Sequence, residues 1–281
     1  MSGWLSWLLV AIVAVWLIAF AYWHLIITEG AYLGQRVVTW LYDLAASRYD
    51  GIKQYTDNME TDFLGYPLVE VLRGIDHPLV LDVATGTARL PTTLLAQGSF
   101  RGQIVGLDHS RQMLAAAAEK TAGWEHRLTL IWRDAIHLPF PDDTFDAVTC
   151  LEMLEFTPYP EAQLAEIIRV LRPGGILMTT RRRGLNARLM PGKTHSPLEF
   201  EVLLEELDMT RIKIQGWQVE YDLVWAIKSG HSPYTVQHPL DMLQCPQCDA
   251  VGQWQEQPDS MHCLTCEAEY PISGGVIEMI Q

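Results

Sequence analysis

Five short apolar runs alternate with segments of helical periodicity, and this alternation constrains the fold of the chain more than any other feature. The runs cover residues 79–84, 103–108, 128–133, 146–151 and 175–180, and helices are predicted between them at 110–123 and 160–171. Nearly continuous apolar strands are typical of a parallel sheet that is covered on both faces. A helix at 197–207 and two strands at 210–218 and 221–228 follow. We therefore predict a mostly parallel α/β sheet with a terminal antiparallel hairpin, in a domain spanning residues 77–230.

A tight turn of small residues follows the first predicted strand, which carries a single acid, Asp82. The turn is Thr85-Gly86-Thr87, preceded by Ala84, and the next helix is predicted to begin near Arg89. Ligands of open α/β sheets bind outside the carboxyl ends of the strands, and small residues let the backbone approach a ligand closely. The turn lacks a full G-x-G-x-x-G pattern, so the dinucleotide fingerprint is not met.

Carboxylates also stand at the ends of the second and third predicted strands. Asp108 ends the second strand, 22 residues after Gly86, and Asp134 ends the third. A carboxylate at Asp108 is able to accept hydrogen bonds from both hydroxyls of a ribose, and one at Asp134 from an adenine amino group. Each acid alone is a weak signal, but the ordered set of turn, Asp108 and Asp134 predicts a nucleoside-containing cofactor.

Several segments of this region resemble the motifs of class I S-adenosylmethionine-dependent methyltransferases. They are Leu81-Asp82-Val83-Ala84-Thr85-Gly86-Thr87-Ala88, Gly106-Leu107-Asp108-His109-Ser110 with Met113, Arg133-Asp134-Ala135, Leu138-Pro139-Phe140-Pro141-Asp142-Asp143-Thr144-Phe145-Asp146, and Arg169-Val170-Leu171-Arg172-Pro173-Gly174-Gly175. Together they cover residues 79–180 and are most similar to the ubiquinone and menaquinone C-methyltransferases. Arg48-Tyr49-Asp50 resembles the short aromatic motif that precedes the core of that group. The resemblance implies a Rossmann-like fold.

The resemblance also implies S-adenosylmethionine as the cofactor and assigns its site residue by residue. The implied cofactor-binding residues are Asp82, Ala84, Thr85, Gly86, Thr87, Asp108, His109, Met113, Asp134, Ala135 and Leu151. The chain departs from the group in two places. Ala84 and Ala88 replace glycines of the stricter first motif, and Phe156 stands where many relatives carry His. Any role of that His is therefore not transferred to this chain.

The sequence assigns no catalytic base. A sulfonium methyl donor has a neutral leaving group, so the protein must mainly hold the nucleophile in line and exclude water. A base is needed only when the acceptor keeps its proton at neutral pH. Candidates near the expected site are Tyr49, His109, Glu152 and Glu155, and each is more simply interpreted as a structural or solvated side chain.

No charged residue occurs from Trp4 to Ile27, a run of 24 residues. A helix of that length rises about 36 Å, and a bilayer core needs about 20 residues. A cleaved signal peptide is the alternative, because Ala19-Phe20-Ala21 fits a cleavage pattern, but there is no basic n-region and the run continues past it. We predict a single-pass anchor over residues 1–28. Basic residues follow the run, which places the catalytic domain in the cytoplasm.

Residues 29–76 show apolar and aromatic residues at mixed helical spacing and are predicted to form short helices. Two interpretations are open for this connector. It packs against the following domain as structural support, or it caps the substrate site.

Two C-x-x-C pairs, separated by 14 residues, mark the C-terminal region as a metal site. The predicted ligands are Cys245, Cys248, Cys263 and Cys266. Two such knuckles form a tetrahedral thiolate site for zinc, and four protein ligands close it, so a structural Zn²⁺ is predicted. The segments around the cysteines resemble the zinc ribbon of the small activator subunits of tRNA, rRNA and protein methyltransferases, so we predict a zinc-ribbon domain over residues 231–281. The fifth cysteine, Cys150, is predicted to be a buried thiol.

The formal net charge of −14 argues against a nucleic acid partner, which needs clustered basic residues. The one dense basic cluster, Arg181-Arg182-Arg183, is interpreted as a solvated loop, with contact to an anionic headgroup or substrate phosphate as the alternative. The sequence carries no signal for an oligomeric state.

The leading functional prediction is methyl transfer from S-adenosylmethionine to a lipophilic small molecule, a quinone precursor or a lipid, at the membrane. Two alternatives stay open. The enzyme acts on RNA or protein and uses the zinc ribbon as a recognition module, or the chain is a membrane protein that binds S-adenosylmethionine without catalysis.

Overall fold

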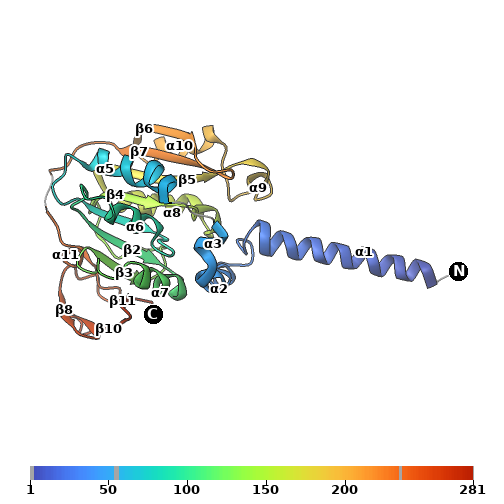
Figure 1. Cartoon of the computed structure of the whole chain (residues 1–281), viewed down its shortest axis with the longest axis horizontal. Helices are drawn as coiled ribbons and strands as arrows, with labels where there is room; N and C mark the ends of the chain where they lie inside the picture. The colour runs from blue at the N-terminus through green and yellow to red at the C-terminus, as the bar shows by residue number, and fades with distance from the viewer. Residues whose placement is uncertain (1–2, 54–56, 234–235, 281) are drawn as a thin grey trace.

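The computed structural model describes residues 3–53, 57–233 and 236–280, and its centre is the predicted α/β sheet (Figure 1). Five parallel strands form the core of the sheet, and two antiparallel strands extend it. The strands are β1 (Leu79–Val83), β2 (Gln103–Asp108), β3 (Leu128–Trp132), β4 (Phe145–Cys150), β5 (Leu171–Arg182), β6 (Met209–Gly216) and β7 (Tyr221–Lys228). Their order is β6-β7-β5-β4-β1-β2-β3, so the strand order reverses at β1, next to β4. The Rossmann-like fold with its terminal hairpin is thus confirmed.

Helices cover both faces of the sheet because the side chains of its central strands alternate between two apolar cores. In β1, Leu81 and Val83 belong to one core and Val80 to the other. The first core is completed by α8 (Pro160–Val170) and α10 (Pro197–Glu206), and the second by α5 (Tyr66–Leu72), α6 (Arg89–Leu95) and α7 (Arg111–Lys120).

Local signals at the helix starts agree with the predictions. Ser110 caps α7, because its hydroxyl accepts the N–H of Met113 at 3.1 Å. Ser196 and Glu199 form a capping box at the start of α10. β5 is longer than the predicted strand at 175–180, since its first residue, Leu171, already pairs with Phe145 across an irregular register.

The C-terminal region continues the same sheet instead of forming a separate layer. It contains α11 (Pro239–Met242), β8 (Trp254–Gln257), β9 (Ser260–Cys263), β10 (Glu269–Ser273) and β11 (Val276–Glu278). β11 pairs in parallel with β3, with Val276 opposite Leu130, and β10, β9 and β8 follow as antiparallel neighbours. The result is one 11-stranded sheet, with the edge of β3 covered by the ribbon.

At the N-terminus, α1 (Gly3–Tyr22) projects away from the rest of the molecule (Figure 1). It carries no charge, and the span Trp4–Ile27 has no buried residue, so length and composition allow it to cross a membrane. A π-helical turn, Trp23–Ile27, ends it. Short helices then lead to the sheet, as predicted: α2 (Gln35–Ala45), a 3₁₀ turn (Ala46–Arg48), α3 (Tyr49–Lys53), α4 (Asp57–Glu60) and a π-helical turn (Thr61–Gly65).

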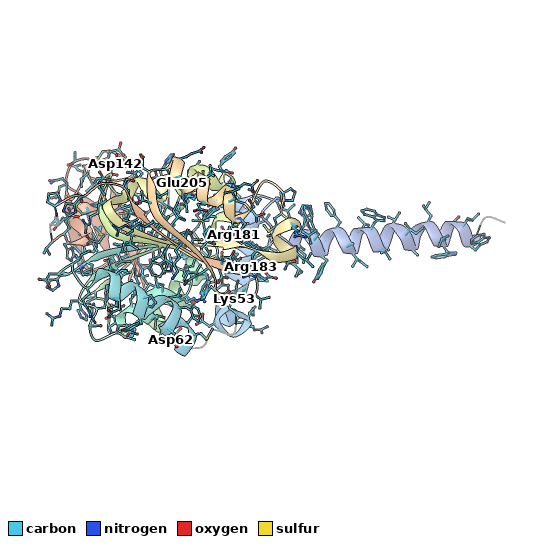
Figure 2. The ribbon with its side chains drawn as sticks, turned by 90° about the horizontal axis from the view of Figure 1, so that it is seen from above. Lys53, Asp62, Asp142, Arg181, Arg183 and Glu205 are labelled. Carbon is cyan, nitrogen blue, oxygen red and sulfur yellow. The ribbon has the colours of Figure 1, made fainter. Side chains whose placement is uncertain are left out.

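The basic cluster is not a solvated loop, which corrects the favoured sequence interpretation. Arg181 and Arg182 are the last residues of β5, and Arg183 precedes α9 (Gly184–Arg188). Arg181 and Arg183 both form ion pairs with Asp222 of the neighbouring strand β7, from the side of the domain that faces α1 (Figure 2). Arg182 is almost completely buried. Asp222 lies on a different strand, far along the chain from the two arginines, so the sequence pattern did not show the pairing.

Candidate functional site

A cavity, open to solvent at its mouth, lies at the carboxyl ends of β1, β2, β3 and β4. One wall consists of the residues that directly follow these strands, and the other comes from α2 together with Phe156 and its neighbours. The residues lining it are Gln35, Val38, Thr39, Tyr42, Tyr49, Ala84, Gly86, Leu107, Asp108, His109, Ser110, Arg133, Ala135, Ile136, Leu151, Glu152, Met153, Phe156, Thr157, Pro158 and Gln163. Its place is typical of a small-molecule site in an open α/β sheet.

The turn after β1 has an unusual backbone that brings it close to this cavity. Ala84, Gly86 and Ala88 all have positive φ angles, of 56°, 55° and 58°. A β-carbon disfavours this conformation, and the two alanines adopt it without the freedom of glycine. The turn is held in place because the N–H of Thr85 donates to the carbonyl of Leu107 on β2. The backbone of the turn therefore forms a fixed edge of the cavity.

Asp82 supports the turn from below. Its carboxylate accepts the hydroxyl of Thr85 at 2.7 Å and that of Thr149 on β4 at 2.6 Å. Burial raises the pKa of Asp82 to about 6, against the lowering effect of the two hydroxyl hydrogen bonds. Asp82 thus acts as a buried link between β1, the turn and β4. A second, smaller cavity on the other side of the turn includes Asp82, Thr85 and Thr87.

Asp108 presents its carboxylate at the cavity from the end of β2. One oxygen accepts the N–H of Gly86 at 2.8 Å and the other accepts the N–H of Ser110 at 2.8 Å. Burial raises its pKa above the ordinary value, although both backbone N–H groups act in the opposite direction. A carboxylate offers about four acceptor positions, so about two stay free after these two contacts. Sequence reasoning proposed these two positions for ribose hydroxyls.

The structure brings most of the implied cofactor residues together, but not all of them. Ala84, Gly86, Asp108, His109, Ala135 and Leu151 line the main cavity. Met113 is buried beneath it in α7. Asp134 is absent from the residues that line the cavities described here, and its carboxylate accepts the N–H of Ile136 at 3.0 Å. The geometry therefore shows Asp134 as the cap of its own turn.

Sequence reasoning left open whether the connector caps the substrate site, and it named none of the α2 residues of the second wall. Val38, Thr39 and Tyr42 of α2 lie opposite the strand ends, together with Phe156. The tyrosine ring approaches the Phe156 ring with their centroids 6.2 Å apart. The signal in the sequence was the helical spacing of apolar residues in α2, which indicates a buried face but not the surface that the face meets.

Acidic residues of the connector fix α2 and α3 over the site. The hydroxyl of Ser110 donates to Asp43 at 2.5 Å. Asp50, within the Arg48-Tyr49-Asp50 segment, accepts the hydroxyl of Thr87 at 2.6 Å and pairs with Lys120 of α7 at 2.7 Å. These contacts join the connector to the turns after both β1 and β2, so the two walls are held against each other.

A buried network of charges borders the cavity at the start of α6. Glu152 pairs with Lys53 at 2.7 Å and with Arg89 at 2.8 Å, and Arg89 also binds Glu60 through two hydrogen bonds. Burial acts to raise the pKa of Glu152, but the two cations outweigh it and hold the pKa below its ordinary value. Glu152 is therefore an ionised, fully paired carboxylate.

Three of the four candidate bases lie at the cavity and one does not. Tyr49, His109 and Glu152 line it, and His109 has a buried Nδ1 without a hydrogen-bond partner among the described residues. Glu155 faces away, into a different cavity, where it accepts the hydroxyl of Tyr221 at 2.6 Å. Its neighbour Glu152 is occupied by ion pairs.

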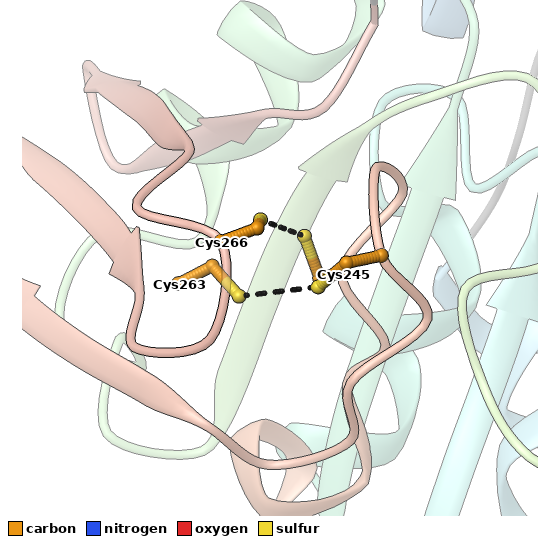
Figure 3. A group of neighbouring side chains, drawn as sticks. Cys245, Cys263 and Cys266 are labelled. Carbon is orange, nitrogen blue, oxygen red and sulfur yellow. Dashed lines mark hydrogen bonds between the residues drawn. The ribbon is translucent and has the colours of Figure 1, made fainter.

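The four C-terminal cysteines gather in one cluster (Figure 3). Their sulfur atoms all lie within 4.8 Å of one another, and the pairs Cys245–Cys266 and Cys248–Cys263 are 3.6 Å apart. Tetrahedral zinc with Zn–S bonds of 2.3 Å requires sulfur atoms roughly 3.8 Å apart. The cluster is thus compatible with zinc. Cys150 lies outside it as a fully buried thiol, as predicted.

Comparison with known proteins agrees with this geometry. Residues 81–179 match the family model described as a methyltransferase domain. This segment is therefore similar to methyltransferase domains. The matched segment runs from β1 to β5 and includes the turn, Asp108 and the Asp82–Thr149 link.

Curated relatives of the methyltransferase domain are named as quinone-modifying enzymes. The chain is 32% identical to a demethylmenaquinone methyltransferase of Thermobifida fusca over 144 residues, 51% of this chain and 60% of the relative. It is 38% identical to the ubiquinone/menaquinone biosynthesis C-methyltransferase UbiE of Geobacter sulfurreducens over 109 residues, 38% of this chain and 43% of the relative. The chain therefore spans about half the length of these relatives.

Solved structures share the fold at low sequence identity. The CurJ carbon methyltransferase superposes with a TM-score of 0.51 at 15% identity, covering 58% of this chain and 52% of that chain. A chain from the Haloferax volcanii complex between the Trm112 methyltransferase activator and a protein described as a methyltransferase gives 0.50 at 19% identity, covering 67% of this chain and 98% of that chain.

Proposed function

We propose that the chain transfers a methyl group from S-adenosylmethionine to a lipophilic small molecule, a quinone precursor or a lipid, at a membrane in which α1 is the anchor. One observation carries the proposal. A single cavity joins a polar wall at the strand ends to a second wall on α2, the helix that follows the apolar N-terminal span. This second wall is mixed, with apolar surface from Val38, Phe156 and the ring of Tyr42 beside polar side chains of α2. A soluble cofactor suits the first wall and a lipophilic acceptor the second.

The polar wall suits the cofactor in several respects. The two free acceptor positions of Asp108 are proposed to bind the ribose hydroxyls, and the left-handed turn at Gly86 leaves the backbone uncovered for close approach. No atom within 4 Å would meet a β-carbon at Gly86, so space for a ligand exists beside it. Ala84, Thr85, Thr87, His109, Ala135 and Leu151 complete the proposed site, with Asp82 beneath the turn, Met113 in the core and Asp134 as the proposed adenine partner.

The residues of the chain need to contribute little to the chemistry of methyl transfer. When bound, S-adenosylmethionine supplies an activated methyl group, and the residues of the cavity need only orient the acceptor and exclude water. The apolar ring of Phe156 and the side chain of Val38 exclude water from the wall opposite the turn. Tyr49 and His109 are polar side chains of the cavity that are placed to bind a proton of the acceptor. Neither is assigned as the catalytic base.

The names of the relatives support a quinone-type acceptor. The proteins from Thermobifida fusca and Geobacter sulfurreducens carry demethylmenaquinone and ubiquinone/menaquinone in their names. The residues matched by the family model contain the cofactor wall and Phe156, while α2 precedes them. The acceptor class is therefore proposed from the chemistry of the cavity together with these names.

The remaining parts are proposed to serve stability and location. The four cysteines bind a structural Zn²⁺, which closes the ribbon and holds β11 against β3. Arg36, Arg48 and Lys53 follow the apolar span, so the positive-inside rule places the methyltransferase domain in the cytoplasm.

A binding and transfer experiment tests the proposal. The full chain, purified in lipid nanodiscs, is titrated with S-adenosylmethionine by calorimetry, and methyl-tritiated cofactor is then offered with total lipid, RNA and protein fractions of cells. We expect cofactor binding and label in the lipid fraction. Label in RNA or protein would replace the lipophilic acceptor by the corresponding macromolecule, and binding without label in any fraction would favour a non-catalytic cofactor-binding protein.

A further inference from the structure

The segment that joins α1 to the domain is docked and does not behave as a free tether. The indole N–H of Trp23 donates to the carbonyl of Leu189 at 3.1 Å, and the hydroxyl of Tyr32 donates to the carbonyl of Pro191 at 2.7 Å. The two rings also stack, with centroids 5.2 Å apart. Thr28, at the end of the π-helical turn, is completely buried. The direction of α1 is therefore fixed relative to the loop after α9.

This docked segment belongs to the same apolar cluster as the acceptor wall of the cavity. Ala31 packs with Phe156 and Met190 in one buried group, and Val38 of α2 is packed against it. Phe156 and Val38 also line the cavity. The base of α1 and the apolar wall of the cavity are thus two sides of one small core.

Large apolar side chains are exposed on both sides of the base of α1, where α2 and α9 lie in Figure 1. We call them the membrane-apposed face: Leu33, Trp40, Leu44, Leu185 and Leu189. The exposed fractions of Trp40 and Leu44 are 55% and 67%, although both are in a helix whose other face is packed. Several exposed apolar groups of this size on the elements at the base of α1 indicate an interaction site.

Arginines flank the membrane-apposed face. Arg36, Arg48 and Arg188 are exposed, and none of them forms an ion pair with another described residue. In a chain with a net charge of −14, three free arginines beside an apolar stripe are a local reversal of charge. Anionic lipid headgroups attract such groups, while the apolar residues enter the acyl boundary.

Among the described elements, α2 lies between the membrane-apposed face and the cavity. Val38 and Tyr42 point into the cavity, while Trp40 and Leu44, each two positions later, point to nearly the opposite side. A helix with its side chains is about 10 Å thick. A molecule dissolved in the bilayer under the membrane-apposed face is therefore separated from the cavity by α2 alone.

We propose that the membrane-apposed face lies in the headgroup region of the bilayer, and that the lipophilic acceptor passes from the bilayer into the cavity between α2 and residues 156–158. The inference rests on the proposed function, because it takes α1 as a membrane anchor and the acceptor as lipophilic. It adds a fixed orientation of the domain and a route that does not cross water.

A photo-crosslinking experiment tests the face directly. p-Benzoylphenylalanine replaces Leu44 or Leu185 in the full chain, and the protein is reconstituted into vesicles of phosphatidylcholine and phosphatidylglycerol. Leu198→p-benzoylphenylalanine, at an exposed leucine of α10, is the matched control. We expect lipid adducts at positions 44 and 185 and only background labelling at the control, because an interfacial helix buries its apolar face at the boundary of headgroups and acyl chains. Equal adducts at all three positions, or adducts to a second copy of the chain in place of lipid, would overturn the proposal.

A pair of acceptors tests the route. Trp40→Glu/Leu44→Glu is compared with Leu198→Glu, using a prenylated naphthoquinol in the vesicle and the same naphthoquinol without its tail in solution. We expect the double variant to lose about tenfold in kcat/KM for the prenylated acceptor alone, which corresponds to 1.4 kcal/mol. An equal loss for both acceptors, or no loss for either, would exclude entry past α2.

The proposed function and the further inference are contradicted by different results. A chain that does not float with the vesicles shows that α1 is no anchor, and a wild-type chain without transfer to either quinol removes the proposed acceptor. Both results are failures of the proposed function. A vesicle-bound chain without lipid adducts at position 44 overturns the further inference alone.

Discussion

The two walls of the cavity are built in opposite ways. The strand-end wall, with Gly86 and Asp108, consists of backbone and polar groups placed by short turns of the central sheet. The α2 wall, with Val38, Tyr42 and Phe156, combines apolar and polar side chains from segments that lie far apart in the sequence. We propose the first wall as the cofactor site and the second as the acceptor site. Four changes separate their contributions, from the largest expected effect to the smallest.

Removal of zinc is expected to loosen the strand-end wall and leave the α2 wall intact. β11 is connected through β10 and β9 to the cysteine cluster, and it covers β3, whose following residues Ala135 and Ile136 line the cavity. Loss of the metal removes about 10 kcal/mol of folding free energy from the ribbon. Hydrogen exchange after chelation should show lost protection in the ribbon and β3, unchanged protection in α2, and weaker cofactor binding. Cys263→Ser should behave like chelation and Cys150→Ala should not. Equal loss of protection in α2 would contradict the separation of the walls.

Asp108→Ala is expected to abolish most cofactor binding without changing the acceptor wall. Two hydrogen bonds to a carboxylate contribute about 4 kcal/mol together, which corresponds to about a thousandfold in affinity. Calorimetry with S-adenosylmethionine measures the change. Asp76→Ala is the control, since that exposed acid lies before β1, at the opposite end of the strand from the cavity. An affinity equal to that of the wild type would remove the ribose assignment.

The pH dependence of stability is expected to report on Asp82. Its pKa is raised from 3.8 to about 6, so the folded state favours the neutral acid. The resulting stabilisation is complete below pH 3.8 and is lost as pH rises to about 6, with a total of about 3 kcal/mol. Thermal unfolding of wild type and Asp82→Asn between pH 4 and about 7 measures the difference. As pH rises, the stability of the wild type should fall relative to that of Asp82→Asn. A constant gap would place the pKa of Asp82 near its ordinary value.

Tyr42→Phe is expected to disturb only the α2 wall. The hydroxyl of Tyr42 donates to Glu29 at 2.8 Å, and burial together with this carboxylate raises its pKa well above the ordinary value. Its loss costs about 1.5 kcal/mol of stability and loosens α2. The KM for the acceptor should rise a few-fold while the affinity for S-adenosylmethionine stays unchanged. Tyr66→Phe, at an exposed tyrosine, controls for the loss of a hydroxyl. A change in cofactor affinity alone would reverse the assignment of the walls.

The same contrast explains how much of the molecule could be predicted from its sequence. The strand-end wall depends on local signals, and the strands, the turn and the cap at Ser110 were predicted within a few residues. The α2 wall depends on contacts such as Asp43 with Ser110, between residues 67 positions apart. Helical periodicity indicated that α2 has a buried face but carried no information on its partner.

Two further features could not be predicted from the sequence for the same reason, because they depend on partners far along the chain. Arg181 looked solvated because its partner, Asp222, lies on a neighbouring strand that only the folded sheet brings close. The cysteine spacing predicted the cluster, but the pairing of β11 with β3 has no local pattern, since a short apolar strand is compatible with many neighbours.

The parallel pairing of β11 with β3 has a consequence for synthesis of the chain. Leu130 and Val276 are roughly 150 residues apart, so β3 leaves the ribosome long before its neighbour is available. During that interval β3 is an open edge, the kind of surface that recruits strands from other chains. If the ribbon forms only with the zinc proposed for its four cysteines, the supply of that metal determines how long the newly made domain stays open to aggregation.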